Sequence, residues 1–567
     1  MKETGNSSSM VSKNVIVIGI DLGTTYSSVG FWIGEELKIR KIPSCVAFTD
    51  YAEPVVGDEA LVGVDKNPSN TVLDFKRLIG AKFSDNRTKL DLFNSPFEVI
   101  PDPVSKNDQL SVIVRSFNRL KTVSAEELLG MILKKLKQIA EKGLGLDNGD
   151  VIINAVISVP SCYNNAQRLA TKVAASIAGF GASRLVNETS AIALAYGWLK
   201  KMKKSREDQQ QQGVETRTPQ KDEENVLIFD LGGGTLSAAV VNIKDGWNRY
   251  KVKSVAGNTH LGGKDFDDLL YRHCHRIQFN NSSARLRSKS SLRFACEKAK
   301  KDLTNPNVTE TEVSVHFYYV RSPKEFLLVR FPVTQHVFDT ECKELFDKCQ
   351  EAIVQCLQNS GISQFHQVIL VGGSTRIPRI REMLRAFCGD ERGFCELMEP
   401  DAAVVQGAAL QAAVWSGGEA SSNLLLDGIS ITDVVPISLK TLAMPNLIPR
   451  NTEIPIVRIL SLKTARNNQR SFCFGVHEGE EVIVEDNNLI GHFIFDGIQA
   501  AEMGLTNITV YFSVDRNGIF NVTAAEDGSR RRQLARRVIN RIPSLTSSMN
   551  LKEIWRIQNR RKVRERI

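Results

Sequence analysis

The 567-residue sequence contains no long apolar run, no paired cysteine motif and no strong excess of one charge over most of its length. No stretch approaches the roughly 18 consecutive apolar residues of a membrane helix, so we expect no transmembrane segment. The leader 1–14 is polar and lacks an apolar core, which argues against a cleaved secretory signal. The ten cysteines form no CxxC pair and therefore indicate reduced thiols rather than a disulfide framework.

The net charge of +9 is concentrated at the C-terminal end. Residues 530–567 contain thirteen Lys and Arg residues against two Glu residues, so the rest of the chain is close to neutral. This distribution favours a solvated basic tail over a tail that binds an acidic partner, and the pI by itself does not indicate nucleic acid. The adjacent His273, Cys274 and His275 lack a second pair of ligands, which favours a surface helix over a metal site.

The remaining composition is that of an ordinary globular protein of several folding units. Two segments have the pattern of β-hairpins in which an Asp ends the first strand and a Gly/Thr turn follows, with turns at Asp21–Thr25 and Asp230–Thr235. A third segment, Val368–Phe387, has the pattern strand, glycine turn, helix. Strands that alternate with helical stretches such as Ala125–Lys142 and Ala166–Gly179 predict α/β architecture.

Three further segments punctuate the chain. Lys200–Asn225 is polar, contains four consecutive Gln residues and predicts a mobile loop. The apolar string Asn423–Asp427 lies in polar surroundings and predicts an interdomain linker. Beyond it, Asp515–Gly518 between two alternating segments is a strong hairpin signal, and the short strands predict a β-sandwich up to about Asn540.

Glycine turns of this kind suit phosphate binding. They let backbone N–H groups approach phosphate oxygens, and flanking hydroxyl groups add donors. A carboxylate at the end of a strand can hold the hydrated Mg²⁺ that accompanies nucleotide phosphates. Two such hairpins facing each other would hold the phosphates from both sides, and a third turn at a helix start strengthens the prediction. The sequence Leu261–Lys264 is no P-loop, because it lacks the upstream Gly and Asp265 follows the Lys.

Six segments, in the expected order, closely resemble the seventy-kilodalton heat-shock chaperone family: Gly19–Ser27, Asp74–Gly80, Val159–Pro160, Phe229–Thr235, His260–Gly263 and Val371–Pro378. The resemblance covers about Val15 to Asn540. It implies an α/β, actin-like two-lobed ATPase domain, followed by an all-β sandwich domain and a helical lid that is mostly missing here. The implied domains are a polar leader at 1–14, a nucleotide-binding domain at 15–420 with a flexible polar insertion at 200–225, a linker at 421–433, a peptide-binding-like sandwich at 434–541 and a basic helical tail at 542–567.

The resemblance also implies roles for individual residues. The implied catalytic residues are Lys76, Glu188, Asp230 and Thr235, with the lysine charge placed at the γ-phosphate and the attacking water. The implied nucleotide-binding residues are Gly23, Thr24, Thr25, Tyr26, Gly233, Gly234, Thr235, Glu297, Lys300, Thr304, Gly373, Ser374, Arg376 and Asp401. Asp21 and Asp230 would hold Mg²⁺ through waters. Pro160 and Arg168 would couple the domains, and Ala465, Phe472 and Phe474 would line the peptide groove.

The sequence departs from the family at several of these places. Ser237 replaces an Asp that helps to bind a monovalent cation, so a K⁺ site is weakened. Lys301 replaces an Arg that packs on adenine, and Lys cannot stack in that way. The other departures are Thr189 for a Pro, Lys264 for an acid, Phe472 for a Val at the groove floor, Phe474 for an Ile, the insertion Gly428–Thr432 and a shortened Thr441–Pro449.

We therefore predict an ATP-dependent molecular chaperone that binds ATP or ADP with Mg²⁺, hydrolyses ATP slowly and binds unfolded polypeptide. The alternative is a nucleotide-gated regulator with little ATPase activity and a weak peptide groove. A sugar kinase on the same fold is disfavoured, since it has no place for a β-sandwich. The expected partners are extended polypeptides, J-domain cochaperones and nucleotide exchange factors, with no DNA and no membrane. The expected location is the cytoplasm, with the nucleus as a second compartment.

Overall fold

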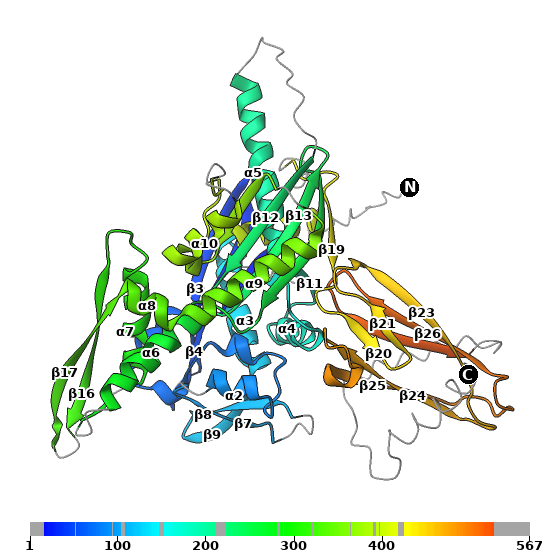
Figure 1. Cartoon of the computed structure of the whole chain (residues 1–567), viewed down its shortest axis with the longest axis horizontal. Coiled ribbons are helices and arrows are strands. Elements are labelled where there is room, and N and C mark those ends of the chain that lie inside the picture. Colours follow the sequence, from blue (N-terminus) through cyan, green and yellow to red (C-terminus); the bar gives the residue numbers. More distant parts are fainter. Residues whose placement is uncertain are drawn as a thin grey trace, which may run out of the picture.

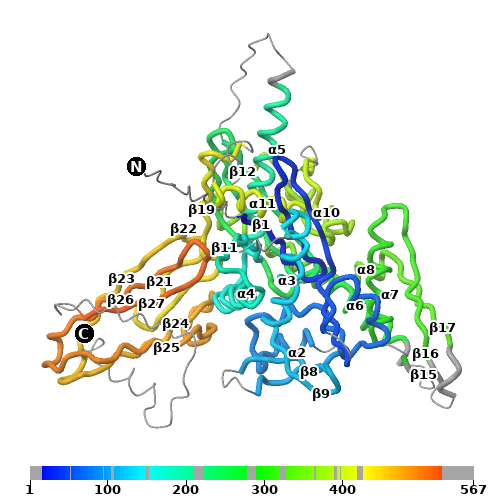
Figure 2. Tube along the Cα trace, turned by 180° about the vertical axis from the view of Figure 1, so that it is seen from behind, coloured from blue at the N-terminus to red at the C-terminus, as the bar shows by residue number. Residues whose placement is uncertain are grey.

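The computed structural model describes residues 16–50, 53–92, 95–103, 108–146, 152, 154–210, 223–279, 284–286, 289–319, 322–362, 365–388, 393–395, 397–417 and 425–526. They form a two-lobed α/β body with an all-β sandwich at its side (Figures 1 and 2). This arrangement confirms the predicted fold class. Within these residues no helix has the length and apolar character needed to cross a membrane.

The first lobe is built on a five-stranded sheet of order β11-β10-β1-β2-β3. Its strands are β1 (Val17–Leu22), β2 (Tyr26–Ile33), β3 (Glu36–Pro43), β10 (Asn154–Val159) and β11 (Ala182–Asn187). β1 and β2 pair antiparallel, which confirms the first predicted hairpin, and β1 pairs parallel with β10. Two small sheets complete the lobe: β4 (Cys45–Ala47) with β5 (Val55–Val56) and β6 (Thr71–Leu73), and β7 (Glu98–Pro101) with β8 (Leu110–Ser116) and β9 (Arg119–Ser124).

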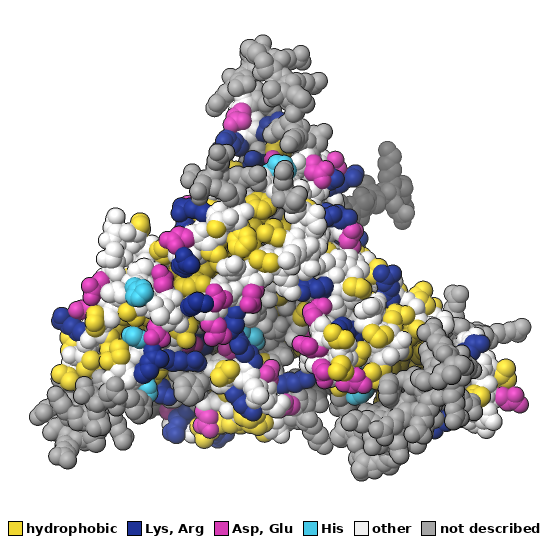
Figure 3. Space-filling model, in the orientation of Figure 1, with side chains coloured by type: hydrophobic (Ala, Val, Ile, Leu, Met, Phe, Trp, Pro, Cys, Tyr) yellow, Lys and Arg dark blue, Asp and Glu magenta, His cyan; other side chains and the backbone are white. Residues whose placement is uncertain are grey.

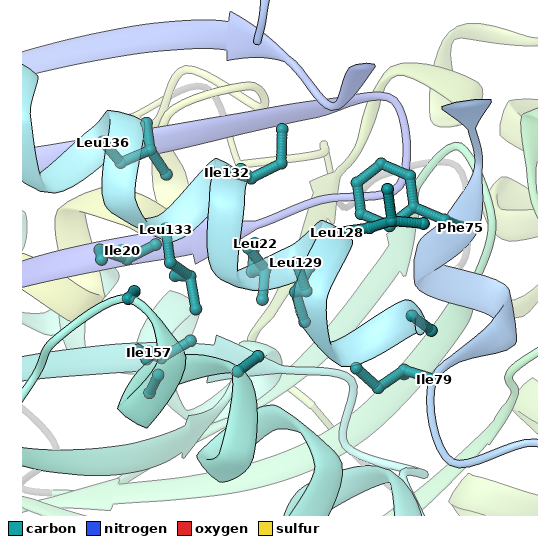
Figure 4. Close-up of a cluster of buried hydrophobic side chains, with 14 of the residues drawn as sticks. Ile20, Leu22, Phe75, Ile79, Leu128, Leu129, Ile132, Leu133, Leu136 and Ile157 are labelled. Carbon is teal, nitrogen blue, oxygen red and sulfur yellow. The ribbon is translucent and has the colours of Figure 1, made fainter. Parts of the chain in front are cut away.

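The core of the first lobe lies between this sheet and its helices (Figure 4). The helices are α1 (Asp58–Val62), α2 (Asn86–Leu92), α3 (Ala125–Gly143) and α4 (Asn165–Ile177), with 3-10 turns at Pro68–Asn70 and Phe75–Leu78. A capping box at Ser124 and Glu127 starts α3, and a stripe of buried Leu and Ile side chains faces β1. Phe75 and Ile79 pack into the same cluster, and this packing fixes the turn that carries Lys76.

The second lobe is built on a six-stranded sheet of order β18-β12-β13-β14-β19-β22. Its strands are β12 (Glu223–Leu231), β13 (Leu236–Lys244), β14 (Arg249–Asn258), β18 (Gln367–Val371), β19 (Ser430–Val434) and β22 (Glu453–Ile454). β12 and β13 form the second predicted hairpin. The third predicted motif is also present, as β18, a 3-10 turn at Gly373–Arg376 and α10 (Pro378–Cys388).

Helices and a long hairpin flank the second lobe's sheet (Figure 1). The helices are α6 (Gly263–Phe279), α7 (Lys289–Asp302), α8 (Gln335–Glu341) and α9 (Lys343–Ser360). The hairpin of β16 (Glu310–Tyr319) and β17 (Ser322–Thr334) extends from the lobe and pairs with β15 (Ala284–Leu286).

Two helices lie between the large sheets, α5 (Glu188–Gln210) and α11 (Ala403–Ser416). Their buried side chains form one cluster with side chains of both sheets. The mobile loop predicted at Lys200–Asn225 is wrong over its first part, because α5 continues to Gln210. Glutamine and lysine are good helix formers, so the polar composition did not end the helix. β12 already begins at Glu223, and residues 211–222 lie outside the described residues.

The sandwich consists of two antiparallel sheets around one core. One sheet contains β20 (Leu439–Thr441), β21 (Met444–Ile448), β24 (Ser471–Glu478) and β25 (Asn488–Asp496), and the other contains β23 (Ile456–Lys463), β26 (Asn507–Val514) and β27 (Phe520–Glu526). The hairpin predicted at Asp515–Gly518 joins β26 and β27, and Gly518 has the positive φ of 72° that this turn requires.

The linker region differs from the sequence-based expectation. β19, at Ser430–Val434, pairs parallel with β14 and extends the second lobe's sheet, so residues interpreted as an insertion contain a strand. Leu426 is buried in the cluster between the sheets, whereas Leu425 is 43% exposed. The leucine string alone therefore does not mark the segment that joins the domains. Alternation of Ile with Ser and Thr in Ser430–Thr432 is the strand signal that was missed.

Candidate functional site

The tips of the two hairpins meet at the bottom of a cleft between the lobes. A Cβ atom on Gly233 would lie 2.1 Å from Thr25 Oγ1, and a Cβ atom on Gly234 would lie 2.4 Å from Thr24 Oγ1. Only glycine allows such an approach of the second turn to the first. The two turns therefore line one cavity of about 670 Å³ from opposite sides.

Nearly all the residues expected to bind nucleotide or catalyse hydrolysis line this cavity. They are Asp21, Gly23, Thr24, Thr25, Tyr26, Lys76, Glu188, Asp230, Gly233, Thr235, Glu297, Lys300, Thr304, Gly373, Ser374, Arg376 and Asp401. Gly234 does not line the cavity but lies in the adjoining turn, where its carbonyl accepts a hydrogen bond from Arg77. Arg168 lies at the face toward the sandwich, Pro160 directly follows β10, and Ala465, Phe472 and Phe474 lie within the sandwich.

The deepest part of the cavity holds three carboxylates and one lysine. Lys76 Nζ lies 3.3 Å from Glu188 Oε1, and both side chains are almost fully buried. Burial alone would lower the pKa of Lys76, but Glu188, Tyr163 and Asp21 raise it above its ordinary value. The lysine therefore keeps its positive charge inside the cleft.

The carboxylates are not fully compensated by this lysine. Burial raises the pKa of Asp21, although Lys76 and a hydrogen bond from Ser158 Oγ, 2.9 Å from Asp21 Oδ1, oppose the shift. Burial also raises the pKa of Glu188. The pKa of Asp230 lies well above its ordinary value because of burial and the nearby charges of Glu188 and Asp21. Three carboxylates against one lysine leave an excess of negative charge that suits a divalent cation.

This donor set fits Mg²⁺ held through waters. In the described part of the chain, no three His, Cys, Asp or Glu side chains are grouped so as to ligate one ion directly. Mg²⁺ commonly keeps several of its waters and uses few protein ligands, so direct grouping is not required. Asp21 and Asp230 lie near the ends of the first strands of the two hairpins, in separate sheets, and are the residues that would orient those waters.

The outer part of the cleft is lined by ion pairs. Glu297 Oε1 lies 2.7 Å from Lys301 Nζ, so the lysine that replaces the expected Arg pairs with the carboxylate predicted to bind nucleotide. Arg376 Nη1 lies 3.3 Å from Asp401 Oδ1 and is half exposed. Lys300 Nζ lies 2.8 Å from Asp267, and burial raises the pKa of that carboxyl to about 7.

A charged clamp across the cleft was missed by the sequence analysis. Arg77, on the same turn as Lys76, contacts Asp91 of its own lobe at 3.1 Å and forms two hydrogen bonds with Asp265 of the other lobe, one of them from Nη1 to Oδ1 at 2.9 Å. Its partner Asp265 is the residue that follows Lys264, and Lys264 itself is buried in the wall of the cavity. The adjacency of two basic residues in Asp74–Gly80 was visible, but the partner in the other lobe, Asp265, lies 188 residues away and gave no sequence signal.

Arg168 joins the two-lobed body to the sandwich. It is 2% exposed, and its guanidinium donates to Tyr163 O and Ser161 O on one side and to Asn517 O of the sandwich hairpin on the other. Asn517 Oδ1 in turn accepts a hydrogen bond from Leu185 N at 2.9 Å. Lys76 Nζ lies 5.8 Å from the centre of the Tyr163 ring. Tyr163 therefore contacts the lysine of the cleft with its ring and, with its carbonyl, the arginine that bonds the sandwich.

Other contacts extend this interface. The Glu478 carboxylate accepts a hydrogen bond from Asn165 N, and Asn165 Oδ1 accepts one from Phe520 N. Arg450 donates to Val255 O at 2.9 Å. Figure 2 shows the sandwich lying against α4 and β11 of the first lobe. Side-chain and backbone contacts therefore hold the sandwich to both lobes.

Within the sandwich, Phe472 faces the core. It is 5% exposed and belongs to the cluster between the two sheets. The ring of Phe474 lies 5.0 Å from that of Phe493 and 5.6 Å from that of Phe512 on the opposite sheet. These aromatic rings fill the space where the sequence analysis expected smaller aliphatic side chains. The side chain of Phe472 is therefore directed into the core and not outward.

The surface gives no sign of a broad single-sign field on the face drawn in Figure 3. Lys and Arg side chains are interspersed there with Asp and Glu side chains around the cleft. Among the described residues drawn on this face, Lys and Arg side chains form no continuous basic patch of the kind that binds nucleic-acid backbone.

Comparisons with known proteins agree with this geometry. The family model described as "Hsp70 protein" matches residues 17–559. The chain is 38% identical over 541 residues to "Heat shock cognate 70 kDa protein 3" of Dictyostelium discoideum, covering 91% of the chain and 79% of that protein. It is 40% identical over 530 residues to "Heat shock 70 kDa protein" of Neurospora crassa, covering 90% of the chain and 76% of that protein.

Proposed function

The chain belongs to the Hsp70 family of chaperones, and we propose that it binds ATP and ADP with Mg²⁺, hydrolyses ATP slowly and couples the nucleotide to the binding of extended polypeptide. The observation that carries this proposal is the cleft itself, where two glycine turns face each other beside three buried carboxylates and one lysine. Slow hydrolysis fits a site whose main groups are a lysine and carboxylates, because phosphoryl transfer depends on positioning and charge stabilisation.

We infer a role for each group of the cleft in this reaction. A water attacks the γ-phosphorus, the bond to the β,γ-bridging oxygen breaks, and ADP and inorganic phosphate result. Lys76 stabilises the negative charge on the γ-phosphoryl oxygens, and the Glu188 carboxylate beside it orients the water and accepts its proton. Mg²⁺, when bound, supplies further positive charge at the phosphates. Asp21 and Asp230 orient its waters, and Thr24, Thr25 and Thr235 add hydroxyl donors to the backbone of the turns.

Two features favour the alternative of a regulator. In the sandwich, the aromatic side chains around Phe474 favour a weak peptide groove. In the cleft, the Glu297–Lys301 pair favours an altered adenine pocket. Such a protein would bind nucleotide, dock or release its sandwich and modulate another chaperone with little turnover. J-domain cochaperones, nucleotide exchange factors and extended polypeptides remain the proposed partners, and the cytoplasm, with the nucleus as a second compartment, remains the proposed location.

A single-turnover assay with Mg²⁺ and radiolabelled ATP tests the proposal. We expect tight nucleotide binding and slow release of phosphate, accelerated by peptide. Binding without phosphate release would favour the regulator, and absence of nucleotide binding would contradict both functions.

Fluorescence anisotropy with a labelled Leu-rich heptapeptide tests the groove. Because Phe472 occupies the core, we expect weak binding and fast release by the wild type and tighter binding by Phe472→Val. Tight, slowly released peptide in the wild type would contradict the weak groove.

A further inference from the structure

Four consecutive residues at the start of α5 contact four different parts of the molecule. Asn187 Oδ1 accepts a hydrogen bond from Arg168 at 2.8 Å, and Glu188 lies beside Lys76. The Thr189 and Ser161 hydroxyl oxygens are 2.7 Å apart. Ser190 Oγ donates to Asp433 Oδ2 of β19 at 2.6 Å. This short segment therefore connects the cleft, the loop after β10 and β19.

Ser161 is the matching junction on the loop after β10. Its N–H donates to Ser237 Oγ of the second lobe at 3.3 Å, and its carbonyl accepts a hydrogen bond from Arg168 at 3.2 Å. Its side chain pairs with Thr189, and both side chains are fully buried. Ser237 does not line the cavity, so its hydroxyl holds this loop rather than facing the phosphates.

The pair of hydroxyl groups has no role in binding nucleotide. Neither Ser161 nor Thr189 lines the cavity, and each gives the other a partner that a buried hydroxyl needs. A proline at position 189, which the family resemblance leads one to expect, would offer no hydroxyl to Ser161. The pair thus links the backbone next to Glu188 with the backbone next to Pro160 in a way that is specific to this chain.

We propose that Ser161 and Thr189 are positioning residues that fix Glu188 against Lys76 and transmit the nucleotide state to Arg168 and β19. The inference rests on the proposed ATP hydrolysis. When the pair is intact, the start of α5 and the loop at Ser161 move as one unit. When it is broken, the Glu188 carboxylate loses one of the constraints on its backbone, while the phosphate turns stay in place.

The test compares Thr189→Val, which keeps the shape and removes the hydroxyl, with Thr189→Ser, which keeps the hydroxyl. The net free energy of one hydrogen bond predicts a fall of about three- to tenfold in the single-turnover rate of Thr189→Val. ATP affinity should change by less than about twofold, since the pair does not touch the cavity, and Thr189→Ser should restore the rate. Thr71→Val is the matched control. Thr71 lies in β6, is equally buried, and its hydroxyl donates a hydrogen bond to Asn67 O.

Ser161→Ala gives a second route if Thr189→Val does not fold. We expect the same fall for Ser161→Ala and no further fall in the double variant, since either change removes the same interaction. The proposal would be overturned if the rate of Thr189→Val were unchanged, or if it fell equally in Thr189→Val and Thr189→Ser. It would also be overturned if the two single effects multiplied in the double variant, or if Thr71→Val slowed the reaction as much as Thr189→Val does.

Hydrogen exchange at the β19 amides separates this inference from the proposed function. We expect ATP to slow exchange at Ser430–Val434 in the wild type and to slow it less in Thr189→Val. If the wild type binds ATP without hydrolysis but this difference persists, the proposed hydrolysis fails and the positioning role stands. If hydrolysis occurs and the exchange of the two proteins responds equally to ATP, the positioning role fails alone. Absence of any response to ATP in the wild type also overturns it.

Discussion

The two hairpins at the floor of the cleft share an Asp-Leu-Gly motif but differ in electrostatics. Each pairs two antiparallel strands and places an Asp before a glycine turn. The Asp21 carboxylate accepts a hydrogen bond from Ser158 and is attracted by Lys76 and Lys41. No hydrogen bond to the Asp230 carboxylate occurs among the residues that the structure describes, and the charges of Glu188 and Asp21 add to its burial.

The difference shows that a repeated motif does not give equivalent sites. The fold around the first Asp gives it one hydrogen bond and two nearby cations, whereas the described residues give the second Asp no hydrogen bond. We therefore expect Asp230 to dominate the response to Mg²⁺ and Asp21 to act together with Lys76.

Lys76→Ala removes the cation that both carboxylates share and should have the largest effect. The hydrolysis rate should fall by about 100-fold or more, because the lysine stabilises charge that develops in the transition state. ATP affinity should change by less than about threefold, as measured by calorimetry beside single-turnover kinetics. Lys66→Ala, at an exposed site, is the control. A normal rate in Lys76→Ala would remove the catalytic assignment.

Asp230→Asn and Asp21→Asn test the comparison directly. Both should weaken Mg²⁺-dependent nucleotide binding, by about tenfold or more for Asp230→Asn. Without nucleotide, Asp230→Asn should stabilise the protein, because burial makes the folded protein keep this carboxyl protonated at a pH where the unfolded chain ionises it. The gain should be smaller for Asp21→Asn, because that change also removes the hydrogen bond from Ser158 and the attraction to Lys41. Thermal unfolding measures both variants, and equal stabilisation would show that the two hairpins are electrostatically equivalent.

The pH dependence of binding should follow the raised pKa values of Asp21, Glu188 and Asp230. A carboxyl with a raised pKa retains a proton in the free protein, and Mg²⁺ favours the deprotonated form, so binding releases protons and tightens as the pH rises. We expect Mg²⁺·ADP to bind about two- to fivefold tighter at pH 8 than at pH 7. Calorimetry in buffers of different ionisation enthalpy counts the protons. We expect Asp230→Asn to reduce the number of protons released on binding more than Asp21→Asn does. The opposite order would contradict the difference between the two hairpins.

Ser237→Asp should have the smallest effect. In the wild type the Ser237 hydroxyl is bonded to Ser161 N, so exchange of K⁺ for Na⁺ should change the hydrolysis rate by less than about twofold. The variant supplies a carboxylate near the second hairpin and should increase the preference for K⁺. The rates in the two salts are compared for both proteins. Strong K⁺ activation of the wild type would show that this site does not need the carboxylate.

Much of the fold was predictable because its signals are local. The apolar strands, the Asp and Gly turns, and the helices at Ala125–Gly143 and Asn165–Ile177 follow from periodicity and turn chemistry. The boundaries near Lys200 and in the linker could not be predicted from composition. Helix propensity extends α5 to Gln210, and pairing with β14 makes a strand of Ser430–Val434.

The sequence by itself determined which residues form the two glycine turns, since glycine and hydroxyl side chains directly follow the first strand of each hairpin. Only the tertiary structure decided how those groups are charged and connected. The raised pKa of Asp230, the Arg77 clamp and the Ser161–Thr189 pair depend on residues that are far apart in the chain and close in space. Burial and the distance between charges determine these interactions. A local sequence pattern predicts neither of them.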